Sequence, residues 1–114
     1  MFVAVLRSLV KMSDDLDDLL DEILEDTYGE HEQLTAFEQA FQEGARFPIK
    51  AQVVGTPVDI TRVEFEGHKR RGLTAVCRRD LESYRVALAD VVSGPLTVET
   101  ARLLAAYRRW LGLR

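Results

Sequence analysis

Residues 47–91, FPIKAQVVGTPVDITRVEFEGHKRRGLTAVCRRDLESYRVALADV, decide the fold, because apolar residues recur there with a period of two. This period is typical of strands whose successive side chains face opposite sides of a sheet. Turn residues divide the stretch into four predicted strands, at 49–54, 58–65, 72–78 and 84–89. Consecutive strands joined by short turns predict an antiparallel meander, which approaches a small open barrel when strongly twisted.

The second of these strands changes phase along its length. Val58 and Ile60 fall on one alternation, whereas Val63 and Phe65 fall on the other. One extra residue in a strand has this effect, so we predict a β-bulge near Thr61-Arg62.

Helical periodicity surrounds the strands. Residues 13–25 carry one apolar stripe, formed by Leu16, Leu19, Leu20, Ile23 and Leu24. A second helix is predicted to end at Gly44, with Thr27 and Glu30 at the spacing of a capping box. A last helix is predicted from Thr97, with its apolar stripe at Val98, Ala101, Leu104, Ala105, Arg108 and Leu111, widened by Leu103, Tyr107 and Trp110.

These elements predict an α+β fold with two N-terminal helices, a small antiparallel sheet of four to five strands and a C-terminal helix. The length of 114 residues suits one domain, which we place at 13–114. Residues 1–12 are interpreted as a poorly anchored extension, because Met12 opens the capped sequence MSDD and could be the true start. The alternative is that residues 1–11 form a short helix or strand on the core.

Charge is unevenly distributed. Residues 1–45 carry 12 acids and 2 bases, whereas residues 46–114 carry 7 acids and 13 bases. Such asymmetry indicates either a charged partner or complementary charges within the fold. The single cysteine suits a reducing compartment, so we expect a cytoplasmic protein. No stretch approaches the ~20 apolar residues of a membrane span.

Signs of catalysis are absent from the sequence. His31 and His68 have no partner at metal-ligand spacing, and Cys77 stands on an apolar strand without a neighbouring base. Glycine-rich phosphate loops, HExxH and serine-elbow motifs are lacking. We therefore expect a protein without enzymatic activity.

Basic residues gather on the predicted third strand, its turns and the neighbouring fourth strand. They are Lys69, Arg70, Arg71, Arg78, Arg79 and Arg85. Small open barrels bind nucleic acid through such faces, so a nucleic-acid or acidic-protein partner is one hypothesis. The sequence pI of about 5.2 and the lack of an aromatic ladder weigh against it.

Residues 25–32, EDTYGEHE, join the first two predicted helices. Carboxylates, a hydroxyl group and the carbonyls of a glycine turn lie within this short segment. Such oxygen atoms are the ligands that calcium prefers, although the EF-hand pattern is absent. The residues alone fit either a helix cap or a calcium site.

The sequence also resembles a known family along residues 25–112. The matching pieces are EDTYGEHEQLTAFEQAF, FPIKAQVV, PVDITRV, YRVALADV and YRRWLG, in this order. Together they resemble the small bacterial calcium-binding protein family typified by the cyanobacterial calcium-binding protein. The resemblance implies an α+β fold and a cytosolic protein that binds or buffers calcium through acidic side chains.

Given that function, the best calcium ligands are five carboxylates. The junction offers Asp26, Glu30 and Glu32, completed by the carbonyl oxygens of Tyr28 and Gly29. Glu64 and Glu66 stand two apart on a strand and so project to one face. The family has an acidic loop where this chain has EFEGHKRRG, and an acid where it has Gly29. Fewer carboxylates predict weaker calcium binding.

Overall fold

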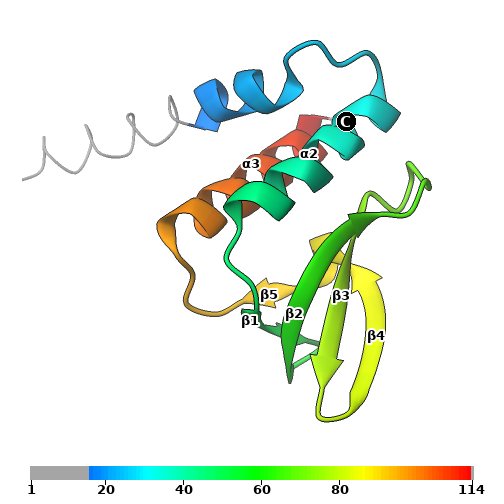
Figure 1. Ribbon diagram of the computed structural model, residues 1–114, viewed down its shortest axis with the longest axis vertical. Helices are drawn as coiled ribbons and strands as arrows, with labels where there is room; N and C mark the ends of the chain where they lie inside the picture. Colours follow the sequence, from blue (N-terminus) through cyan, green and yellow to red (C-terminus); the bar gives the residue numbers. More distant parts are fainter. Residues whose placement is uncertain (1–15, 114) are drawn as a thin grey trace, which may run out of the picture.

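The computed structural model describes residues 16–113. A first helix covers 16–24 of this range, and the other elements follow it along the chain. They are α2 (Glu30–Gly44), β1 (Ile49–Val53), β2 (Thr56–Phe65), β3 (Leu73–Arg79), β4 (Glu82–Ala87), a 3₁₀ turn at Leu88–Asp90, β5 (Val92–Ser93) and α3 (Val98–Leu113). Figure 1 shows the helices grouped on one side of a twisted sheet, with α2 and α3 side by side. The predicted α+β class is confirmed.

The five strands form one antiparallel sheet in the order β4-β3-β2-β1-β5. The sheet is open, with β4 and β5 as its edges, so the barrel-like tendency does not lead to closure. The predicted bulge is confirmed, because the register shifts between Ile60, opposite Cys77, and Arg62, opposite Val76. Thr61 is the extra residue, and its hydroxyl donates a hydrogen bond to the Val76 carbonyl at 3.2 Å.

Three features near the sheet's edges differ from the prediction. The β3–β4 connection was expected to span 79–83, but it is a two-residue turn in which Asp80 has φ of 54° and Leu81 is 94 % exposed. The predicted strand at 84–89 ends at Ala87, where the 3₁₀ turn begins. None of the four strands placed in the sequence extends past residue 89, yet Val92 and Ser93 pair with Gln52 and Ala51 as β5.

The core lies between the sheet and the helices. Phe37 packs edge-on to Tyr107 at a ring-centroid distance of 5.5 Å and contacts Trp110 at 5.4 Å. Phe41 is 6.4 Å from Tyr107, and all four aromatic side chains are buried. The aromatic residues of α2 therefore pack on the closing aromatic residues of α3.

The buried face of α3 is rotated from the predicted stripe. Val98 is 71 % exposed and Ala101 is exposed, whereas Leu103, Tyr107 and Trp110 are buried. Burial of an aromatic ring removes far more apolar surface than burial of an alanine, so the two rings and Leu103 determine which face meets the core. Of the predicted stripe, Leu104 is buried and Val98, Ala101 and Arg108 are exposed. The residues predicted to widen it, Leu103, Tyr107 and Trp110, are all buried.

The two long helices begin differently. Thr97 caps α3 as predicted, since its hydroxyl oxygen accepts the Thr100 N–H at 3.2 Å. The capping box predicted from Thr27 and Glu30 is wrong, because α2 starts at Glu30 with Gly29 as its N-cap and without a side-chain cap. The Thr27 hydroxyl donates instead to the Leu24 carbonyl at 2.6 Å, at the end of the first helix.

Two further expectations concern residues 1–12 and the lack of a membrane span. The interpretation of residues 1–12 as an extension falls on residues outside the described range. Within residues 16–113, no helix is long and apolar enough to cross a bilayer.

Candidate metal site

The junction between the first helix and α2 carries three of the five predicted ligands. Asp26 has a left-handed backbone, with φ of 60°, and Gly29 has φ of 89°, so the chain reverses tightly here. Glu32 turns back over the junction, where its carboxylate accepts the Tyr28 N–H at 2.5 Å. All three acids are exposed. The Gly29 carbonyl, a predicted ligand, accepts the Gln33 N–H at 3.1 Å as the first bond of α2.

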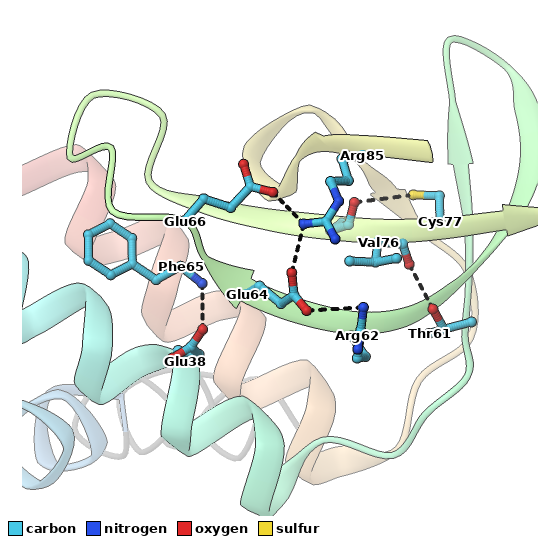
Figure 2. Close-up of polar contacts among 10 residues, drawn as sticks. Glu38, Thr61, Arg62, Glu64, Phe65, Glu66, Val76, Cys77 and Arg85 are labelled. Atoms are coloured by element: carbon cyan, nitrogen blue, oxygen red, sulfur yellow. Dashed lines mark hydrogen bonds and ion pairs between the residues drawn. The ribbon is translucent and has the colours of Figure 1, made fainter. Parts of the chain in front are cut away.

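Glu64 of β2 and Glu66, the residue directly after the strand, lie on the same side, as their spacing predicts, and both contact the side chain of Arg85. Arg85 of β4 reaches both carboxylates with the same terminal nitrogen, at 2.8 Å to Glu64 and 2.5 Å to Glu66. Figure 2 shows this guanidinium group between the two acids, with Arg62 on the other side of Glu64 at 3.2 Å. Hydrogen bonding to Glu66, together with the charge of Glu64, raises the pKa of Arg85 above its already high ordinary value.

The residue between these glutamates faces the other way. Phe65 lies against α2, where its N–H donates to Glu38 at 2.7 Å and its ring meets the His31 ring edge-on at 5.0 Å. His31 is the neighbour of Glu30 and Glu32 in the first turn of α2. The junction therefore lies beside the end of β2, but the alternation of the strand directs Glu64 and Glu66 to the face opposite Phe65.

The five predicted ligands thus form two groups rather than one cluster. In the described part of the chain, no three His, Cys, Asp or Glu side chains are close enough together to hold a metal ion. Binding at the junction would require Asp26, Glu30 and Glu32 to converge. The ligand set stays a prediction.

The basic residues are also divided between two places. Lys69, Arg70 and Arg71 lie in the β2–β3 connection, whereas Arg78 and Arg79 lie at the opposite end of β3. A seven-residue strand separates these ends by roughly 20 Å. Arg85 lies between them and is engaged with the glutamates. The result is two small basic groups instead of one continuous basic face.

Ion pairs show how the uneven charge is accommodated. Four ion pairs join strand bases to acids of the sheet or of the turn after β2, as in Lys50–Asp59 at 2.7 Å. Another joins Arg109 of α3 to Asp17 of the first helix at 2.9 Å.

Cys77 has the character expected of a structural thiol. Its side chain is fully buried in β3, and burial raises the pKa of the thiol. A raised pKa disfavours the thiolate that a nucleophile requires.

The role of Arg62 and Arg85 as partners of the glutamates was missed from the sequence. Arg85 was assigned to a basic cluster, because the register that brings it to Glu64 across β3 is a tertiary property. Part of the signal was local, since Arg62 and Glu64 are two apart and so lie on the same face of the strand.

Proteins of known structure share this fold. A calcium binding protein in its calcium-binding form matches with a TM-score of 0.73 at 14% identity, covering 88% of this chain and 91% of that chain. Anabaena CcbP matches with a TM-score of 0.66, also at 14% identity, covering 82% of this chain and 89% of its own. The resemblance inferred from the sequence is confirmed at the level of the fold. No family model matches the sequence, and no curated protein matches it.

Proposed function

We propose that this protein binds calcium ions, and that it does so in the cytoplasm without catalysing a reaction. One observation carries the proposal: the likeness to a calcium binding protein in its calcium-binding form extends over 88% of this chain and 91% of that chain. The match extends well beyond the five strands, which lie within residues 49–93. It therefore supports a shared binding role more strongly than a match of the sheet alone.

The junction is the proposed binding place. Asp26, Glu30 and Glu32 are exposed carboxylates within seven residues, on the tight turn between the first helix and α2. Calcium accepts six to eight oxygen ligands in flexible geometries, so a turn that adjusts on binding suits it. Glu32 would exchange its bond to the Tyr28 N–H for the ion. Water and the Tyr28 carbonyl complete the proposed shell.

Glu64 and Glu66 could act as calcium ligands only if their arginine partners moved away from them. Each is already paired with a guanidinium group, so neither offers calcium an unneutralised charge. The alternative hypothesis of a nucleic-acid or acidic-protein partner gains no support from two basic groups that lie at opposite ends of β3.

Calorimetric titration of the full chain with calcium, in parallel with magnesium, tests the proposal. We expect saturable binding of calcium at or below about 1 mM and much weaker binding of magnesium, which requires a near-ideal octahedral shell. Absence of saturable heat with calcium, or equal binding of the two ions, would contradict it.

A further inference from the structure

Arg85 lies on the edge strand β4, but its side chain reaches across the sheet. The side chain extends from β4 across β3 to the acids that flank Phe65 of β2, as Figure 2 shows. In the sheet register, Val76 of β3 is opposite both Arg62 and Arg85. Val76 is only 7 % exposed although it belongs to the open face of the sheet, which is consistent with cover from the aliphatic stems of these two arginines.

The charges of this group are balanced. Glu64 contacts both arginines and Glu66 contacts Arg85, so two carboxylates face two guanidinium groups. The glutamate side chains are 24% and 28% exposed, so both are partly removed from water within the network. A guanidinium group cannot lose its charge near neutral pH, and its donors fit carboxylates in a fixed geometry. Its charge therefore stays in place at any physiological pH.

We propose that Arg85 is the resident counter-ion of Glu64 and Glu66 and thereby excludes calcium from this pair of acids. This inference rests on the proposed calcium-binding function and narrows its ligand set to the junction. A divalent ion at the pair would have to displace the guanidinium group, and it would then sit beside the two positive charges of Arg62 and the displaced Arg85. Arg85 thus determines which acids of this fold can bind a cation.

The inference predicts that replacing the two acids leaves calcium binding nearly unchanged, whereas replacing Arg85 strengthens it. Glu64→Gln with Glu66→Gln, made in the otherwise unchanged chain, should leave the calcium titration within about twofold of the parent. Arg85→Gln frees both carboxylates and keeps a polar side chain on the edge strand. This variant should bind calcium at least tenfold more tightly than the parent, or bind one additional ion.

Two further variants make the comparison specific. Arg62→Gln removes an equal charge from the same face but leaves Arg85 on both acids, so it should bind calcium nearly as the parent does. The triple variant Arg85→Gln, Glu64→Gln, Glu66→Gln should lose whatever Arg85→Gln gained. Calorimetry gives affinity and stoichiometry, and the calcium-dependent shift in melting temperature provides an independent readout, because a ligand bound to the native state raises it. Circular dichroism establishes that each variant is folded.

The outcomes separate this inference from the proposed function. If the parent does not bind calcium but Arg85→Gln does, the proposed function fails while the role of Arg85 stands. If Glu64→Gln with Glu66→Gln weakens calcium binding of the parent tenfold, the two acids are ligands and the inference about Arg85 is wrong. It is equally wrong if Arg85→Gln binds calcium no better than Arg62→Gln does.

Discussion

The phenolic oxygen of Tyr107 accepts a hydrogen bond from the backbone N–H of Leu73 at 2.8 Å, although the two residues are 34 positions apart. Leu73 is the first residue of β3, and Tyr107 lies in the middle of α3. Both residues are buried. This bond satisfies a strand N–H that would otherwise be enclosed in the core without a partner, and it fixes the last helix on the sheet.

Tyr107→Phe should destabilise the protein, because it removes the acceptor of the Leu73 N–H. The ring and its packing on Phe37 remain, but the Leu73 N–H loses its acceptor, which typically costs about 1–3 kcal/mol for a buried donor. Tyr84→Phe is the matched control, because no hydrogen bond of the Tyr84 hydroxyl is found within the described residues. Urea denaturation should show the loss for Tyr107→Phe and almost none for Tyr84→Phe. Equal stabilities of the two variants would mean that the bond contributes nothing.

Trp110→Ala should cost about 3–5 kcal/mol, the usual result of truncating a buried aromatic side chain. Trp110 is 4 % exposed, contacts Phe37, and donates from its indole nitrogen to Gln33 at 3.1 Å. Tyr28→Ala, at a side chain that is 83 % exposed, should change the free energy of unfolding by less than about 0.5 kcal/mol. A near-neutral Trp110→Ala in chemical denaturation would place this ring at a surface and would point to a partner site there.

Local patterns in the sequence predicted most of the fold, because they record which face of each element is buried. The change of phase between Ile60 and Val63 was enough to place the bulge, since alternation in a strand leaves only two possible faces. The phase of α3 was not predictable in the same way, because apolar residues surround much of that helix. The strand at Val92–Ser93 was missed because its two residues have no periodicity, and only pairing with β1 defines it.

In the candidate site, too, local spacing was predictable from the sequence, whereas tertiary contacts were not. The spacing of Glu64 and Glu66 correctly placed them on one face, where both contact Arg85. The spacing did not reveal that their partner is an arginine, or that Phe65 directs them away from the junction. These features depend on the register of three strands and on the docking of α2. The capping box failed for a related reason, since Thr27 had a nearer acceptor in the Leu24 carbonyl.

A chain that begins at Met12 should fold as stably as the full chain. The described contacts of the first helix, Leu20 in the core and Asp17 paired with Arg109, all lie after this position. We expect the melting temperature to change by less than about 2 °C, since a loss of 1 kcal/mol corresponds to about 4–8 °C for a domain near this size. A fall of several degrees in a thermal denaturation experiment would show that residues 1–11 contribute to the core.

The last prediction locates calcium binding at the junction. Asp26→Asn with Glu32→Gln removes two charges but keeps the size and hydrogen-bonding capacity of both side chains. The amide oxygen that Glu32→Gln introduces can still accept the Tyr28 N–H, so the turn should be preserved. Loss of two ligand charges should weaken calcium binding at least tenfold, which corresponds to about 1.4 kcal/mol.

Calorimetric titration checks this expectation against a control with the same change in net charge. Asp18→Asn with Glu43→Gln alters exposed acids of the first helix and of the far end of α2, away from the junction. Long-range attraction of calcium by the whole acidic surface would weaken binding equally in both double variants, and more so at low ionic strength. Direct ligation by Asp26 and Glu32 instead predicts a loss confined to the junction variant. If that variant binds calcium as the parent does, the ion is not held at the junction.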